Sequence, residues 1–216
     1  MNEQQLRQDL IATGIHLNAT GLNRGTSGNL SARCSEGFLV TPSGLTCEEM
    51  TPADIVLMGF DGSCSGPRNP SSEWRFHRDI LASRPEIGAV VHTHSMFATT
   101  LACIGLDIPA FHYMIALAGG NSIRCAPYAT FGSEELSAHA LRALEGRRAC
   151  LLANHGMIAL GATPGDTAAL ALEVETLCEQ YGRALQIGTP KLLSDAEMDV
   201  VLEKFKNYGK PAQGPA

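Results

Sequence analysis

Apolar residues recur every three or four positions in several stretches of the chain, which is the spacing of a helix with one buried face. The predicted helices span residues 3–18, 70–83, 133–146, a long stretch that begins after Thr163-Pro164 and ends before Pro190, and a last stretch from Ser194 to Gly209. Ser194 and Glu197 form a capping box that marks the start of the last helix.

Short runs rich in β-branched residues lie between these helices and predict strands. The predicted strands cover residues 29–33, 37–44, 54–60, 89–94 and 149–161, the last of these divided into two strands near 154–156. Helices and strands interleave without the regular spacing of βαβ units. We therefore expect an α/β fold of three layers (α/β/α), with a mostly antiparallel central sheet and helices on both faces.

The organisation of the chain is simple. It has no internal repeat and no Pro/Gly/Ser linker, so we expect one domain over residues 1–216, with a disordered tail at about 210–216.

Composition excludes several classes of protein. The chain has 44% apolar and 18% charged residues, which excludes disorder. It lacks a run of about 18 apolar residues and a signal-peptide segment, so we expect no membrane span. The net charge is −6 without a basic cluster, so nucleic acid is not an expected partner. The seven cysteines include no C-x-x-C pair, and we interpret them as reduced, mostly buried thiols of a cytoplasmic protein.

The histidines give the first indication of a functional site. His92 and His94 stand two apart on a predicted strand, so both imidazoles project from the same face. Such a pair alone is often incidental, but His155 at a strand junction adds a third imidazole. Glu73, in the first turn of its predicted helix, is either a plain capping residue or a carboxylate beside a metal. Together they predict a catalytic zinc site with an open position. His77, one turn after Glu73, is interpreted as packing or as a neighbour of the site.

Three small loops suggest a phosphate site. They are GTSGN (25–29), TPSG (41–44) and PSS (70–72). Glycine lets backbone N–H groups approach an anion closely, and serine or threonine hydroxyls add donors. Each loop alone is more often a turn. Together they suggest a small phosphorylated substrate bound without dominant lysine or arginine.

Long strings in the sequence resemble the class II aldolase/adducin family. These strings are GTSGN, TPSG, SSEWRFH, VVHTH, FHYMIALAGGNSI, CAPYATFG, NHG and VLEKFKNYG, spread over residues 25–209. Thr93 and Asn154 depart from the family's pattern, at positions that are not ligands. The resemblance implies a homotetrameric α/β fold that holds one Zn²⁺ per subunit.

The same resemblance implies roles for individual residues. His92, His94 and His155 would bind zinc, and Glu73 would serve as fourth ligand and as acid and base. Tyr113 would reach a neighbouring subunit's site as proton donor. Further substrate contacts would come from Gly28, Asn29, Ser43, Gly44, Ser71 and Ser72 at the phosphate, Phe131 at the aldehyde, and Tyr208 nearby.

The activity implied is reversible cleavage of a ketose 1-phosphate, such as L-fuculose 1-phosphate, to dihydroxyacetone phosphate and a small aldehyde such as L-lactaldehyde. A sugar-phosphate decarboxylase, dehydratase or epimerase of the same fold is an alternative. A non-catalytic module like the adducin head is another, which loss of the metal histidines would mark. All three histidines are present, which favours an enzyme.

Overall fold

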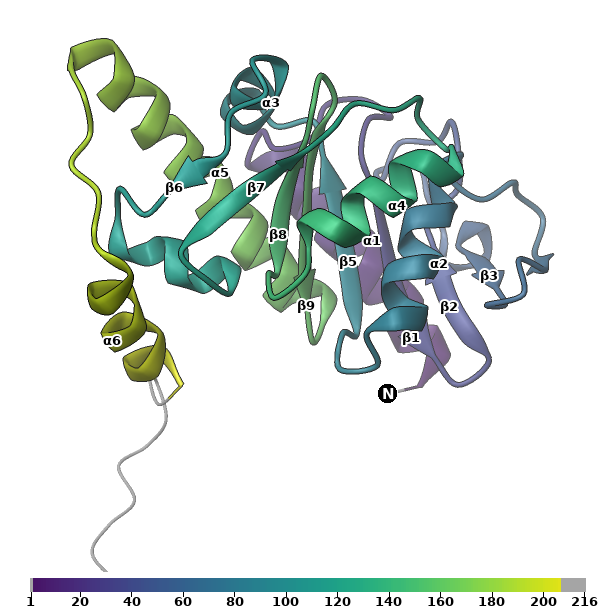
Figure 1. The fold of residues 1–216 in the computed structure, drawn as a ribbon. Helices are drawn as coiled ribbons and strands as arrows, with labels where there is room; N and C mark the ends of the chain where they lie inside the picture. The colour runs from purple at the N-terminus through teal and green to yellow at the C-terminus, as the bar shows by residue number, and fades with distance from the viewer. Residues whose placement is uncertain (1, 207–216) are drawn as a thin grey trace, which may run out of the picture.

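The central feature of the fold is a sheet that runs through the middle of the molecule (Figure 1). The structure is a computed structural model, and it describes residues 2–206. Within these residues the sheet has nine strands in the order β4-β3-β2-β1-β5-β9-β8-β7-β6. The strands are β1 (Asn29–Cys34), β2 (Gly37–Val40), β3 (Val56–Met58), β4 (Cys64–Ser65), β5 (Ala89–Thr93), β6 (Ile108–Pro109), β7 (Ser122–Ala126), β8 (Ala149–Leu152) and β9 (Gly156–Gly161). Described neighbours pair antiparallel except β7 and β8, which are parallel.

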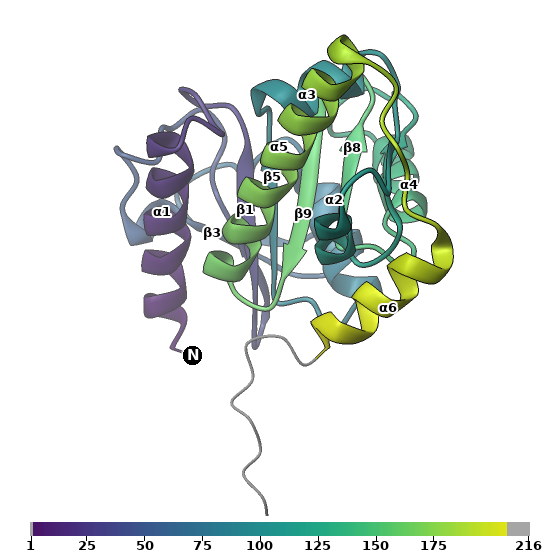
Figure 2. The same ribbon diagram turned by 90° about the vertical axis from the view of Figure 1, so that its left-hand side faces the viewer.

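Helices cover both faces of the sheet, as Figures 1 and 2 show. The helices are α1 (Glu3–Ala19), α2 (Trp74–Ser83), α3 (Met96–Cys103), α4 (Glu134–Ala143), α5 (Pro164–Ile187) and α6 (Asp195–Phe205), with short 3₁₀ turns η1 (Pro52–Asp54) and η2 (Tyr113–Ala118). Apolar residues of α1, α3, α5 and η2 form one core with the sheet, and those of α2 and α4 form a second core on the opposite face. The three-layer prediction with a mostly antiparallel sheet is confirmed.

The helices α1, α2, α4, α5 and α6 and the strands β1, β2, β3, β5, β8 and β9 were predicted, whereas β4, α3, β6, η2 and β7 were not. Several boundaries also differ. β5 ends at Thr93, so His94 lies directly after the strand and not on it. β2 ends at Val40. Thr41 still donates its backbone N–H to Leu30 O, and Pro42 then pairs with Pro70 outside the sheet. α2 begins at Trp74, so Glu73 is its N-cap residue and does not lie in the first turn. The expected helix end at Gly209 and the expected tail at 210–216 lie outside the described residues.

Two other expectations concern the chain as a whole. Among residues 2–206, no helix combines the length and apolarity needed to cross a membrane. Every cysteine in that range is unpaired. Only Cys150 and Cys178 are buried, so the expectation of mostly buried thiols was wrong: Cys64 and Cys103 are exposed.

Candidate active site

The candidate site lies at one end of the central strands. β1 begins at Asn29, which pairs with His92 near the end of β5, and β5 ends where β9 begins, with Thr93 opposite Met157. Because neighbouring antiparallel strands run in opposite directions, the end of β5 and the starts of β1 and β9 meet at one edge. The start of α2 faces the same edge and carries Glu73.

Four side chains converge there. One ligand atom from each of Glu73, His92, His94 and His155 lies within 4.8 Å of the others. The Nε2 atoms of His92 and His94 are 2.9 Å apart. The Glu73 carboxylate lies 3.3 Å from His92 Nε2 through Oε2 and 3.2 Å from His155 Nε2 through Oε1. The four residues predicted from the sequence as metal ligands therefore form one compact group.

Backbone contacts orient the imidazoles. His92 Nδ1–H donates to the carbonyl of Met157 at 2.9 Å, which leaves the Nε2 lone pair directed into the group. Gly156 follows His155 and allows the rings to approach. A Cβ at this position would lie 2.3 Å from Thr93 O and 3.1 Å from His94 Cδ2. A larger residue at 156 would push the histidines apart.

The electrostatics favour neutral His94 and His155 beside an ionised Glu73 carboxylate. Desolvation, and after it the neighbouring His92, lowers the pKa of both His94 and His155 to about 4. Burial acts to raise the pKa of Glu73, but His92, His155 and a hydrogen bond from Asn29 together hold it below its usual range. Near pH 7 these are the protonation states that a metal ligand requires.

An unsatisfied oxygen supports a metal at this site. Glu73 is 6% exposed, and its Oε1 is buried without a hydrogen-bond donor from residues 2–206. Buried polar atoms are nearly always paired, so an orphaned carboxylate oxygen facing imidazoles calls for a cation. Three imidazoles and a carboxylate form the donor set of a catalytic zinc-type site. The residues present therefore fit a divalent metal.

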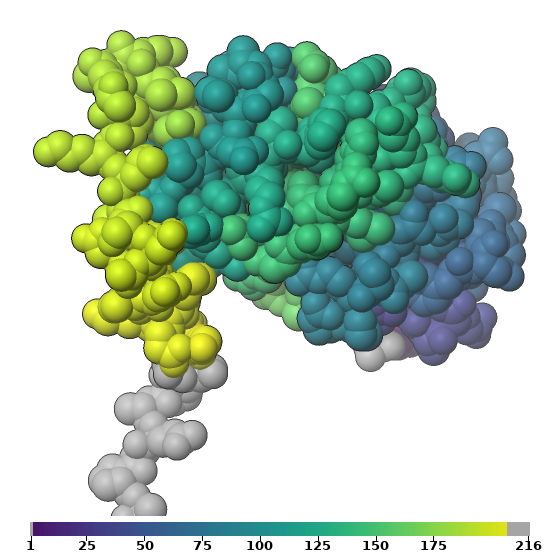
Figure 3. Space-filling model, viewed as in Figure 1, coloured from purple at the N-terminus to yellow at the C-terminus, as the bar shows by residue number. Residues whose placement is uncertain are grey.

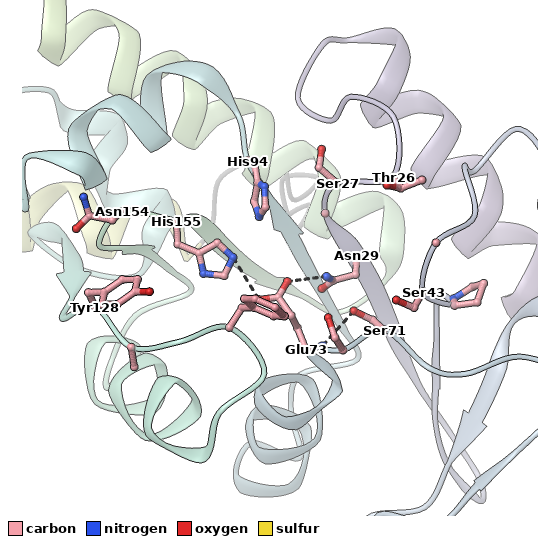
Figure 4. Close-up of a pocket in the computed structure, with 16 residues that line it drawn as sticks. Thr26, Ser27, Asn29, Ser43, Ser71, Glu73, His94, Tyr128, Asn154 and His155 are labelled. Carbon is pink, nitrogen blue, oxygen red and sulfur yellow. Dashed lines mark hydrogen bonds and ion pairs between the residues drawn. The ribbon is translucent and has the colours of Figure 1, made fainter.

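A cavity of about 370 Å³ opens beside this group. Figure 4 shows the small loops on one side of Glu73 and Tyr128 with Asn154 on the other. The cavity lining includes all six predicted phosphate contacts, together with Thr26, Ser27, Pro42, Glu73, His94, Tyr128, Ala129, Phe131, Asn154 and His155.

Two of the small loops are bound to each other. Pro42 and Pro70 form an isolated β-bridge. The backbone N–H of Ser43 donates to Asn69 O at 3.1 Å, and that of Ser71 donates to Thr41 O at 3.0 Å. Among the described residues that line the cavity none is lysine or arginine, so donors for an anion there would come from hydroxyls and backbone N–H groups.

The Asn29 side chain already has hydrogen-bond partners within the site. Its side-chain amide donates to Glu73 Oε2 at 2.9 Å, and its carbonyl oxygen accepts from His77 Nε2. The side chain is therefore used in holding the carboxylate. The predicted phosphate contact would be left to the Asn29 backbone.

One predicted substrate residue, Tyr113, does not lie in this cavity. Tyr113 is 51% exposed and lines a separate apolar groove with Met114, Leu117 and Val201. Residues of η2 and α6 form this groove, and α6 lies at the left-hand edge of the molecule in Figures 1 and 3. Tyr208 lies outside the described residues.

Thr26 and Ser27 line the cavity inside the GTSGN loop, which the sequence predicted as part of a phosphate site. Sequence reasoning did not single out Tyr128 and Asn154 as lining residues. Tyr128 stands inside the CAPYATFG string, but its residue type alone does not indicate a pocket. Asn154 has a φ of +56°, the left-handed conformation, which no other non-glycine residue among 2–206 adopts. Asparagine tolerates this conformation better than most residues. It turns the chain immediately before His155.

Fold and site together define a three-layer α/β protein with a candidate metal centre beside hydroxyl-rich loops. The chain belongs to the family described as Class II Aldolase and Adducin N-terminal domain, whose model matches residues 8–181.

Individual relatives are similar over nearly the whole chain. The 5-methylthioribulose-1-phosphate/5-deoxyribulose-1-phosphate aldolase of Rhodospirillum rubrum is 59% identical over 211 residues, 98% of this chain and 96% of the relative. The L-fuculose phosphate aldolase of Escherichia coli K12 is 47% identical over 210 residues, 97% of this chain and 98% of the relative. A solved structure of an L-fuculose 1-phosphate aldolase superposes with a TM-score of 0.91 at 42% identity, over 94% of this chain and 96% of that one.

Proposed function

We propose that this protein is a zinc-dependent aldolase that cleaves a ketose 1-phosphate into dihydroxyacetone phosphate and a short aldehyde. The observation that carries the proposal is the group of Glu73 and three histidines, which shares one cavity with the hydroxyl-rich loops. The described residues that line the cavity include no lysine that could form a Schiff base with the ketone.

The chain's own residues supply positioning and proton transfer. The loops around Ser43 and Ser71 hold the phosphate and thereby place the ketone near Glu73. A divalent cation held by the imidazoles would act as a Lewis acid toward the ketone oxygen. In the direction of carbon–carbon bond formation, Glu73 takes a proton from the hydroxymethyl carbon, and the electron pair left on that carbon attacks the aldehyde carbonyl. In cleavage, the same carbon regains its proton from Glu73.

The aldehyde end of the substrate faces Tyr128, Ala129 and Phe131. These side chains are aromatic or apolar, and they suit a deoxy or methylthio terminus better than a chain of hydroxyls. The relative with 59% identity acts on 5-methylthioribulose and 5-deoxyribulose 1-phosphates by its name. We therefore place these two ketose phosphates first as substrates. L-Fuculose 1-phosphate is the second candidate, on the strength of the relative with 47% identity.

A product assay with zinc-loaded protein tests the function. The substrates are 5-deoxyribulose, 5-methylthioribulose and L-fuculose 1-phosphates, with a phosphorylated 3-oxo acid to detect a decarboxylase. Dihydroxyacetone phosphate is measured by coupled reduction. We expect it from the ketose phosphates, with the highest kcat/KM for the first two. Release of carbon dioxide from the oxo acid without cleavage of any ketose phosphate would contradict the proposal.

We also propose a homotetramer in which Tyr113 of one subunit protonates the aldehyde oxygen in its neighbour's site. Tyr113 is exposed and lines a different groove from its own chain's candidate site, which supports this assignment. Tyr113→Phe and Glu73→Gln should each be inactive, whereas reshuffled hybrids should recover activity, because some sites then hold both residues intact. Hybrids that form by native mass spectrometry but stay inactive would contradict the shared site.

A further inference from the structure

A buried chain of hydrogen bonds leads from β1 through α2 to the carboxylate of Glu73. Ser31 in β1 and His77 in α2 are both 0% exposed. Ser31 Oγ lies 2.7 Å from His77 Nδ1, and His77 Nε2 contacts Asn29 Oδ1. Asn29 Nδ2 then donates to Glu73 Oε2 at 2.9 Å. Neither Ser31 nor His77 lines the cavity, so they reach the site only through Asn29.

The donor and acceptor in each of these hydrogen bonds follow from the charge of the Glu73 carboxylate. An ionised carboxylate only accepts, so Asn29 must turn its NH₂ group toward Glu73 and its oxygen toward His77. His77 must then carry its proton on Nε2, which leaves Nδ1 to accept from the Ser31 hydroxyl. Burial, and after it the nearby His92, lowers the pKa of His77 to about 3, consistent with a neutral ring that has one N–H.

The arrangement leaves the two oxygens of Glu73 unequal. Oε2 accepts the amide of Asn29, whereas Oε1 receives no hydrogen bond from the described chain and lies toward His155. If the Asn29 amide rotated by half a turn, its oxygen would face the Glu73 carboxylate, and the two oxygens would repel each other. The donor on His77 and the hydroxyl of Ser31 oppose that rotation.

We infer that His77 and Ser31 are positioning residues that fix the Asn29 amide on Glu73 Oε2, so that Oε1, the oxygen that faces the imidazoles, is the one that carries the reacting proton. The inference rests on the proposed function, in which Glu73 moves that proton. A purely structural role for the same bonds predicts something different: lost stability, with an unchanged rate for each metal-loaded site.

Ser31→Ala provides the mildest test, and Ser137→Ala is its matched control. Ser137 is also a buried serine bonded to α2, with Oγ 2.6 Å from Asp79 Oδ2, but that bond does not lead to Glu73. Both variants should lower Tm. Only Ser31→Ala should also lower kcat, by a few-fold, with KM and metal content unchanged, because the phosphate loops are intact.

His77 variants should give a larger effect. His77→Leu removes the donor to Asn29 and should reduce kcat about 10–100-fold, the usual cost of losing a partner behind a site residue. His77→Gln keeps an N–H donor and should recover most of that loss. If His77→Leu does not fold, the two serine variants decide the question. Equal kcat in Ser31→Ala, Ser137→Ala and the wild type would overturn the inference.

The ¹⁵N shifts of the His77 ring provide a readout that does not depend on activity. We expect the neutral Nε2–H tautomer in the wild type and an increased share of Nδ1–H in Ser31→Ala. A wild-type ring protonated on Nδ1 would overturn the inference even in an active enzyme. Absence of turnover on every ketose phosphate, with the Nε2–H tautomer present, would instead contradict the proposed function alone.

Discussion

The two sides of the cavity are built differently. One side, called the metal side here, carries Glu73 and the three histidines. Hydrogen bonds fix its side chains: His92 donates to the Met157 carbonyl, and Asn29 donates to Glu73. The segment after His94 is tied down as well, since Glu175 of α5 accepts from the backbone N–H groups of Phe97 and Ala98. On the aromatic side, Tyr128 and Phe131 are 60% and 64% exposed.

Under the proposed function, this difference separates chemistry from substrate choice. Proton transfer and metal binding need atoms held within a fraction of an ångström, which buried and hydrogen-bonded side chains provide. Recognition of a short aldehyde needs only apolar contact, and an exposed aromatic loop can vary without disturbing the metal side. Variants of the metal side should therefore abolish the reaction, and variants of the aromatic side should redirect it.

The largest effect is expected from His94→Ala. One of three converging imidazoles is lost, so bound metal and turnover should both fall to background. Elemental analysis and the aldol assay measure the two quantities. His16→Ala, on the exposed face of α1, is the control and should retain both. Full turnover in metal-free His94→Ala protein would show that the metal side does not carry the chemistry.

Glu73→Gln separates metal binding from proton transfer. The three imidazoles remain, so much of the metal should stay bound, while the rate should fall by about 10²–10⁴, the usual contribution of a placed acid or base. Exchange of solvent protons at the hydroxymethyl carbon of dihydroxyacetone phosphate reports on this residue directly. Exchange at the wild-type rate would assign the base to another group.

Acid should destabilise the metal side of the chelator-treated protein. Burial lowers the pKa of His77 to about 3 and the pKa values of His94 and His155 to about 4. An imidazole in the unfolded chain has a pKa of about 6.5. At pH values between about 4 and 6.5, these imidazoles are protonated in the unfolded chain but remain neutral in the folded chain. The free energy of unfolding is therefore highest above pH 6.5 and falls as the pH drops toward 4.

Tm recorded from pH 7.5 to 4.5 checks this expectation. His77→Gln removes one of the three groups and should make Tm less dependent on pH, whereas His16→Gln should leave the dependence unchanged. A Tm that rises as the pH falls would show that these rings are protonated in the folded protein.

The same contrast explains what the sequence could predict. His92 and His94 were identifiable because side chains two positions apart on an extended segment project from the same face, although β5 itself ends at Thr93. The bond between Asn29 and Glu73 depends on the register of β1 against β5 and on how α2 packs, which no local pattern encodes. β7 has no strong local pattern, and its parallel pairing with the predicted strand β8 is likewise not encoded locally. Tyr128 could not be singled out, because an exposed tyrosine in a loop is ordinary until the cavity is visible.

The smallest effect, and the sharpest test of the aromatic side, is expected from Tyr128. The ring lines the cavity on the side away from the phosphate loops, where Figure 4 places it beside Asn154. Loss of apolar contact with one methyl or methylthio group changes selectivity by about 1–3 kcal/mol. Tyr128→Ala should therefore lower kcat/KM for 5-methylthioribulose 1-phosphate about tenfold relative to L-fuculose 1-phosphate, with metal content unchanged.

Tyr128→Phe is the matched control, since it keeps the ring and removes only the hydroxyl. If the ring recognises an apolar terminus, Tyr128→Phe should behave like the wild type toward the methylthio substrate. A loss of the same size in both variants would assign recognition to the hydroxyl, and the preferred substrate would then be one with a polar terminus. An equal loss for all ketose phosphates would place Tyr128 with the metal side and remove the division between the two sides of the cavity.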